Sequence, residues 1–406
     1  MTSLMGRVEE MEVWITEIVK GIGRFFFNPL FYWFFFIVFL ASIARIKKER
    51  KMFGSKIYDV FDEIRFTWGS ALLFGFILSI IAFGLGVTFS YSMVGVLALL
   101  TILLSITRSF MRLSPAYTFG LAYLLLLLAP YYEDYLPFNI SMELTNLQWV
   151  IFTTAMGIFL LYEAYFISRM HNDASYPERM QGSRGKVIGQ HRIKKASLIP
   201  VVTLLPLGDL TSFMDWWPII PLGNDEFGLI CFPIVIGFEH YVRGMIPYKA
   251  LQGYAQSLLI LGFVVMGVAI TGYYLPILTL ISVVIALVGR ETLSFRFRMN
   301  DRQKNPYFTP QAEGMMVLGV IPGTPAQEIG LLAGEKIMKV NARPVNSEQE
   351  FYEALQANRT YCKLDVLDER GEIRFVQRAM YQGEHHELGV LFCNQYAFYG
   401  EKVKSE

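Results

Sequence analysis

Long apolar runs fill the first three quarters of the chain, and a mixed polar pattern replaces them after about residue 299. A helix needs about 20 apolar residues to cross the hydrocarbon core, because lipid cannot satisfy backbone polar groups. Seven runs fit this requirement and predict membrane-spanning helices. They are Phe25–Ala44, Ser70–Val87, Met93–Thr107, Ala116–Tyr131, Leu147–Ile167, Ala255–Tyr274 and Pro276–Val288.

The stretch 197–244 is also apolar, but five prolines interrupt it. We expect two further crossings here, over Leu198–Leu210 and Phe227–Phe238, as re-entrant or broken helices. The alternative is that this stretch only dips into the membrane. The chain then has about seven to nine crossings, and either odd number places its two ends on opposite sides.

Basic residues predict the orientation, because lysine and arginine gather in cytoplasmic loops. Clusters follow the first, third, fifth and last predicted spans, whereas the opposite loops contain Glu133–Asp134 and almost no basic residue. The C-terminal part is therefore expected in the cytoplasm. Residues 5–22 carry an apolar stripe at helical spacing, which predicts an interfacial amphipathic helix outside the membrane core.

The composition also indicates one part of the chain in lipid and another in water. Of the 406 residues 53% are hydrophobic, and the mean hydropathy is +0.38, which is unusual for a soluble protein. Residues 306–406 instead carry 14 acidic and 10 basic side chains. We predict an interfacial helix (1–24), a multi-pass domain (25–299), a linker (300–305), a soluble domain (306–395) and a tail (396–406).

The soluble part contains a specific signature: Val317-x-x-Val320-x-Pro-Gly-Thr-Pro-Ala326, followed by Gly330-Leu331-x-x-Gly334-Glu335-x-Ile337. This order resembles a bacterial PDZ domain, although that family usually has aspartate where this chain has Glu335. The alternating runs Tyr361–Leu367 and Ile373–Met380 predict a hairpin in the same domain. The predicted fold is thus an α-helical polytopic membrane domain followed by a small α+β PDZ-like domain.

PDZ domains bind a peptide C-terminus by adding it as a strand to a sheet edge beside a helix. A Leu-Gly-apolar loop, which would hold the carboxylate, is absent before the first strand but occurs as Leu388-Gly389-Val390. We expect a circular permutation in which this segment forms one wall of the groove, and Phe351 and Leu355 form the other. The alternative is that residues 387–392 merely complete the sheet.

Candidate catalytic chemistry is missing from the sequence. The five histidines (His171, His191, His240, His385 and His386) make no His-Glu-x-x-His motif, and no Gly-x-Ser-x-Gly elbow or P-loop is present. Cys231, Cys362 and Cys393 are scattered and form no metal motif. We therefore predict no catalytic residue, no metal and no cofactor.

Charged residues near the predicted spans leave two further possibilities. Asp209, Asp215 and Glu239 could line a transport path, but we expect them at span ends in headgroup water, with Glu239 and His240 as an interfacial pair. The basic loop 169–195 could contact nucleic acid, but juxtamembrane basic clusters more often pair with anionic lipid. We expect anionic lipid and no nucleic acid.

The layout of the whole chain resembles the MinJ family of division-site topology proteins. The resemblance rests on the order of Asn28-Pro29-Leu30-Phe31-Tyr32, Ile57-Tyr58-Asp59-Val60, Trp216-Trp217-Pro218, Gly289-Arg290-Glu291 and Pro306-Tyr307-Phe308. It implies a non-catalytic scaffold at the cell membrane, enriched at septum and poles, which links DivIVA to MinD and its partner MinC. The competing hypotheses are an intramembrane protease or protease regulator, and a transporter with a PDZ appendage.

Overall fold

The computed structural model describes residues 2–131, 144–170, 174–182, 185–211, 217, 226–358, 360–381 and 388–393. Within them, every one of the seven predicted spans is helical. These helices are α2 (Pro29–Phe53), α3 (Trp68–Leu85), α4 (Tyr91–Ser105), α5 (Pro115–Leu128), α6 (Asn146–Ser168), α7 (Pro247–Thr271) and α8 (Ile277–Gln303). Five apolar helical stretches are long enough to cross a membrane, and α4 and α5 are shorter apolar helices. The structure confirms a helical membrane domain.

Local sequence explains where several helices begin. Asn28 caps α2 by accepting a hydrogen bond from the Leu30 N–H at 2.9 Å, and Pro29 fits the first turn. Thr145 and Gln148 form a reciprocal capping box at the start of α6. The last helix, α8, continues through Gln303 and so extends into the predicted linker.

The two segments predicted as broken helices, Leu198–Leu210 and Phe227–Phe238, are strands in the described residues, so that prediction is wrong. The chain forms β1 (Ser175–Gln181), β2 (Val187–Thr211) and β3 (Glu226–Val242), an antiparallel sheet in the order β1-β2-β3. Pro200 lies opposite Pro233 in the β2–β3 register, and the register shifts between Leu205 and Leu210. Proline is tolerated in such strands where its nitrogen faces away from the partner strand or where a bulge interrupts the ladder.

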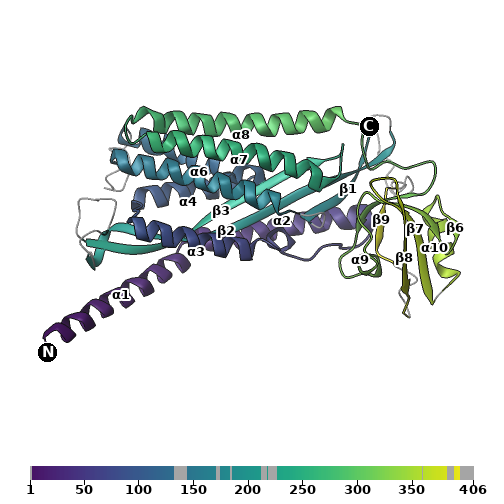
Figure 1. Cartoon of the computed structure of the whole chain (residues 1–406), viewed down its shortest axis with the longest axis horizontal. Helices are drawn as coiled ribbons and strands as arrows, with labels where there is room; N and C mark the ends of the chain where they lie inside the picture. Colours follow the sequence, from purple (N-terminus) through teal and green to yellow (C-terminus); the bar gives the residue numbers. More distant parts are fainter. Residues whose placement is uncertain are drawn as a thin grey trace, which may run out of the picture.

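The β2–β3 hairpin runs along the helices inside the membrane domain (Figure 1). Its residues Ile199, Val201 and Phe232 share one core with side chains of α4 to α8, such as Phe152 and Leu258. One face of the long strands therefore packs against these helices.

Neighbouring segments satisfy the free edges of this hairpin. On the β2 edge, Ser79 of α3 accepts a hydrogen bond from the Val202 N–H at 2.9 Å. Leu204 pairs with the turn before α4, where its N–H donates to Val87 O at 3.1 Å and its carbonyl accepts from the Phe89 N–H at 3.0 Å. Unpaired backbone groups are costly away from water, and these contacts satisfy the groups of Val202 and Leu204 that face away from β3.

The helix α1 (Thr2–Phe26) covers the β3 edge. The Glu17 carboxylate accepts from the Leu229 N–H at 3.3 Å, and the Arg24 guanidinium donates to the Leu229 carbonyl. Glu17 is 1% exposed, whereas Ile15 and Val19 of the predicted apolar stripe are 60% and 63% exposed. Ile15 and Val19 thus face away from the protein, whereas Glu17 and Trp14 face it. The position of the helix on the membrane surface stays a prediction.

The C-terminal domain is a sheet in the order β8-β7-β5-β4-β9, with two helices against it. Its elements are β4 (Met315–Val320), α9 (Pro325–Glu328), β5 (Lys336–Val340), β6 (Arg343–Pro344), α10 (Glu348–Gln356), β7 (Tyr361–Leu367), β8 (Ile373–Ala379) and β9 (Val390–Phe392). The predicted hairpin is β7–β8. Glu335 accepts from the Leu332 N–H at 2.8 Å, so glutamate serves in the turn where aspartate is usual. This domain lies at the end of the molecule opposite α1 (Figure 1).

Candidate functional site

The predicted groove residues come together in the C-terminal domain. Strand β9 forms one edge of the sheet beside β4, with Val390 opposite Val320. The rings of Phe351, on α10, and Phe392, on β9, meet at 5.0 Å between centroids. Leu355 and Leu388 belong to the same core. The segment 388–392 therefore lies beside α10, as the permuted arrangement requires.

The five predicted residues are all buried: Phe351, Leu355 and Leu388 are 0% exposed, Val390 is 6% exposed, and Gly389 is also classed as buried. Gly389 has φ of +87°, and an added Cβ would lie 2.1 Å from Thr324 Oγ1. Only glycine fits this turn. The walls of the expected groove are thus packed against each other in this structure.

The membrane domain holds the C-terminal domain through β1 and β2. Gly189 of β2 donates its N–H to Phe308 O at 2.8 Å, and a Cβ there would lie 2.3 Å from Leu318. A Cβ added at Gly319 would lie 2.9 Å from Pro177 Cγ. His191 contacts the Phe308 ring at 4.6 Å, and its complete burial lowers its pKa to about 4. The two domains therefore meet through backbone and small residues at very short range.

A charged network lies beneath this contact. Arg45 of α2 is paired with Glu49 at 2.5 Å and with Glu63 at 2.8 Å. Lys195 of β2 is paired with Asp62 at 2.7 Å, and all five side chains are less than 9% exposed. The loop after α2 is thereby fixed against the sheet and against α2.

The stretch 169–195, predicted as a basic loop that binds lipid, contains strand residues whose basic side chains are paired within the protein. Arg179, Arg192, Lys194 and Lys195 belong to β1 and β2. Arg192 is paired with Glu239 at 2.6 Å, and Lys194 with the same carboxylate at 3.5 Å. These cations are therefore engaged within the protein, because the sheet turns them toward acidic and carbonyl partners. These four are thus not expected to bind lipid, whereas Arg169 and Lys186 of the same stretch are exposed, and lipid binding there stays a prediction.

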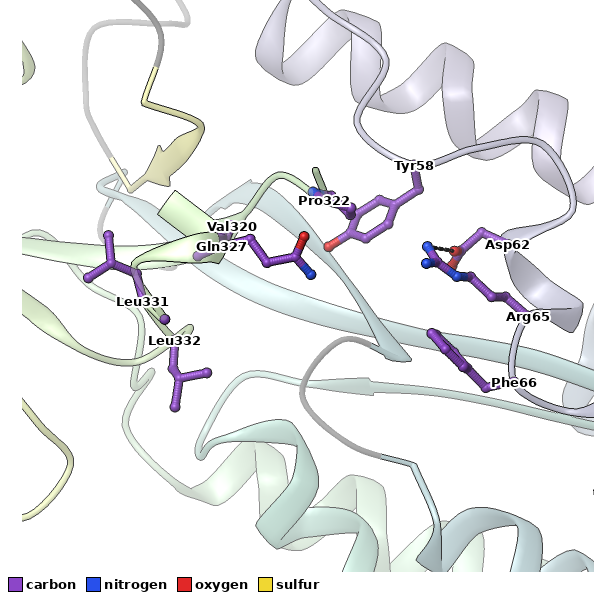
Figure 2. A pocket seen from close by; sticks show the side chains of 10 residues that line it. Tyr58, Asp62, Arg65, Phe66, Val320, Pro322, Gln327, Leu331 and Leu332 are labelled. Carbon is purple, nitrogen blue, oxygen red and sulfur yellow. Dashed lines mark ion pairs between the residues drawn. The ribbon is translucent and has the colours of Figure 1, made fainter. Parts of the chain in front are cut away.

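A cavity of about 220 Å³ separates the loop after α2 from the turn that follows β4 (Figure 2). Tyr58 and Arg65 reach it from the membrane domain, and Gln327 and Leu332 from the PDZ-like domain. Arg65 is half exposed and lies 3.7 Å from Asp62. The junction of the domains thus offers a small mixed surface on the predicted cytoplasmic side.

The acidic residues that suggested a transport path lie in different settings. Asp209 is exposed and pairs with Lys20 at 2.8 Å. Glu239 is 9% exposed and accepts from the Phe110 N–H at 2.9 Å, so its expected place in headgroup water is wrong. Asp215 lies outside the described residues, as do Glu133, Asp134, His171, His385 and His386.

Sequence reasoning missed a buried ion pair in the helical bundle. Arg290 of α8 donates to Glu163 of α6 at 2.9 Å, and both side chains are 0% exposed. The guanidinium also donates to Ser114 at 3.1 Å and to the hydroxyls of Tyr254 and Ser294. Glu163 within an apolar run was the available signal. Because these partners satisfy both charges, the pair is a structural link and not an open ion path.

Among the described residues, no group of three or more His, Cys, Asp or Glu side chains is arranged to hold a metal ion. The described thiols of Cys231, Cys362 and Cys393 are unpaired with each other. Burial raises the pKa of Cys393 to about 11, which disfavours a thiolate nucleophile.

Together these features define a helical membrane protein that carries a PDZ domain at its C-terminal end. A family model described as PDZ domain matches residues 316–367. The chain is 36% identical over 380 residues to the cell division topological determinant MinJ of Bacillus subtilis (strain 168), covering 93% of this chain and 96% of that protein. The chain belongs to the MinJ family of cell division topological determinants.

Two further relatives differ in extent. A probable MinJ of Lacticaseibacillus paracasei is 34% identical over 128 residues, which cover 32% of this chain and 34% of that protein. A putative serine protease, HhoA of Synechocystis sp., is 35% identical over 81 residues, which cover 19% and 20% of the two chains. The match to HhoA covers only 19% of this chain, whereas the match to the Bacillus protein covers 93%. The shorter match is therefore no evidence of protease activity in this chain.

Proposed function

We propose that this chain is a non-catalytic membrane adaptor for division-site placement. In this proposal it links DivIVA, at curved membrane near poles and septa, to MinD and MinC through predicted cytoplasmic surfaces. The similarity to a division determinant over 93% of the chain is the observation that carries the proposal. The PDZ domain supports it, because PDZ domains act by capturing protein segments.

Localisation and partner recovery both test the adaptor function. A fluorescent fusion of the full chain should gather at septa and poles of dividing cells. In a separate experiment, removal of residues 306–406 should reduce the amount of MinD recovered with the tagged protein. The reason is that removal of the PDZ domain leaves the membrane domain but deletes its proposed docking groove. A fusion that fluoresces evenly around the membrane of dividing cells would contradict the proposal. Expression of the truncated chain at the full-length level is the control.

The peptide groove remains part of this proposal, with Leu388, Gly389 and Val390 on one wall and Phe351 and Leu355 on the other. Their shared core supports a site in which a C-terminal carboxylate meets the 388–390 turn. A protein or peptide with a free C-terminus is the expected ligand, because backbone N–H groups in such a turn bind carboxylates. The ligand's side chains would then replace part of the packing between α10 and β9, where the Phe351 and Phe392 rings now meet.

Anionic lipid is the second partner that we propose, at a cavity of about 360 Å³ between α7 and α8. Lys249, Arg296 and Lys304 line it, and Lys249 also pairs with Glu369 of the C-terminal domain at 2.5 Å. Asp301 lines it too, but its carboxylate already accepts backbone hydrogen bonds from the turn between β3 and α7. The cavity lies near the start of a predicted span, where a basic pocket between helices suits a lipid headgroup.

Replacing these three cations together by glutamine should weaken binding of phosphatidylglycerol roughly 100-fold, since each basic group near the surface contributes about 1 kcal/mol. Fluorescent phosphatidylglycerol added to the detergent-solubilised protein gives the measurement. The matched control replaces Lys47, Arg50 and Arg112, which belong to the other predicted cytoplasmic clusters, and should retain binding. Equal loss in both triple variants would show nonspecific attraction instead of this site.

A further inference from the structure

The strand β9 has one edge engaged by the sheet and one edge directed away from it. The Gly389 carbonyl accepts from the Ile321 N–H at 2.9 Å and so faces the β4 side. Backbone groups alternate along a strand, so Leu391 faces the same side, and Val390 and Phe392 face the opposite side. That opposite edge is the one to which an added peptide strand would pair.

The membrane domain already occupies this edge. Arg179 of β1 donates to the Phe392 carbonyl through Nη2 at 2.8 Å and Nε at 3.1 Å. Its remaining Nη1 donates to Met52 O at 3.2 Å, and its guanidinium lies 4.8 Å from the Phe53 ring centroid. Arg179 is 9% exposed, so this contact is enclosed by protein.

A negative charge at the start of the second wall of the groove also acts on this guanidinium. This charge belongs to Glu348, the first residue of α10. Arg179 itself occupies the edge of β9 to which a peptide would pair. A hydrogen bond from a charged guanidinium to a carbonyl is stronger than one from the neutral amide of a peptide. Arg179 can therefore compete with a peptide for this edge.

We propose that the membrane domain closes the PDZ groove, with Arg179 as an internal ligand that a partner's C-terminal segment must displace. This inference rests on the groove of the proposed function and adds its regulation. The competing segment supplies a backbone N–H to Phe392 O in place of the guanidinium. Displacement also separates β1 from the PDZ domain, so ligand capture and undocking are one coupled event.

The structure contains a built-in reporter of docking. The Cys393 thiol donates to Val187 O of β2 at 3.7 Å and to Phe308 O at 3.6 Å, and it is 2% exposed. It therefore lies in the contact between the domains. Cys362 lies in the core of the PDZ domain itself and should respond only to unfolding.

Two variants loosen the contact by different means. Arg179→Ala removes the internal ligand. Gly189→Ala adds a methyl group that would lie 2.3 Å from Leu318 Cδ1 and 2.8 Å from Phe308 Cβ, so it wedges the domains apart without changing the arginine itself. The matched controls are Arg343→Ala, on the exposed strand β6, and Gly253→Ala, where an added Cβ has nothing within 4 Å.

Maleimide labelling of the full-length protein in nanodiscs measures undocking. We expect Cys393 in both test variants to react at least tenfold faster than in the wild type, with Cys362 unchanged and both controls at the wild-type rate. Unchanged Cys393 labelling in both test variants would overturn the internal-ligand proposal. Faster reaction of Cys362 as well would mean that the domain unfolds, which also contradicts a simple undocking.

A second measurement tests separately whether Arg179 closes the groove and whether the groove binds a peptide at all. The same nanodisc samples are passed over an immobilised library of random peptides with free C-termini, and over the amidated library as a control. We expect both test variants to retain at least tenfold more free-C-terminal peptide than the wild type. Faster Cys393 labelling without any peptide retention would support Arg179 docking but refute the peptide groove. Equal retention by the wild type would refute the closure.

Discussion

Replacing Glu163 with alanine should destabilise the membrane domain by about 3–5 kcal/mol, because it leaves Arg290 charged and unpaired in a fully buried position. The guanidinium connects the start of α5 through Ser114, α6 through Glu163, α7 through Tyr254 and its own helix through Ser294. Removing the Glu163 carboxylate therefore disturbs the contacts of Arg290 with all four helices. Thermal unfolding of the detergent-solubilised protein, followed by size-exclusion chromatography, measures the effect.

Glu291 provides the matched control for this change. It is the next residue to Arg290, it is 53% exposed, and it pairs with Arg298 at 2.9 Å. Exposed pairs contribute about 0–1 kcal/mol, so Glu291→Ala should be nearly silent. A double variant with Glu163→Leu and Arg290→Met should recover much of the lost stability, because apolar replacement of a whole buried pair is tolerated. Equal effects at Glu163 and Glu291 would contradict the buried pairing.

Gly75→Ala should separate α3 from the β2–β3 hairpin and cost about 1–3 kcal/mol, the usual range for overpacking. A Cβ at Gly75 would lie 2.2 Å from the Pro200 carbonyl oxygen and 3.1 Å from Ile199. The nearest atom belongs to the backbone of a paired strand, so it cannot rotate away. The shift would also break the bond from Val202 to Ser79 on the same helix.

Gly84→Ala is the control on the same helix, since an added Cβ there has nothing within 4 Å. Alanine is the better helix former, so this variant should be neutral or slightly more stable than the wild type. The difference in thermal midpoint between the two variants isolates the contact with the hairpin. Equal midpoints would mean that α3 does not pack on β2 as described.

The sequence predicted the elements whose signal is local. Apolar runs such as Leu147–Ile167 and Ala255–Tyr274 are helices because lipid forces the backbone to satisfy itself within each segment. The turn chemistry around Gly330 and Gly334 likewise specified the PDZ domain, since both need positive φ values, here +79° and +97°. Family membership also followed from the order of such motifs along the chain.

Prediction failed where an apolar run could belong to a strand or a helix. Around Leu198 and Phe227 the sequence is apolar and rich in proline, so it was interpreted as broken helices. Periodicity alone cannot distinguish a buried strand from a buried helix in so short an apolar run. The hairpin depends on Ser79, Glu17 and Arg24, which lie far away in sequence and satisfy its edges.

The sequence by itself thus determined that this protein has apolar spans followed by a PDZ domain, because lipid and tight turns constrain each segment locally. Only the tertiary structure decided that Glu163 meets Arg290 and that Arg179 reaches Phe392. These partners lie 127 and 213 residues apart, and a charge in the sequence does not show which buried group it will face. Burial makes each pairing obligatory, because an unpaired charge removed from water is too costly to retain.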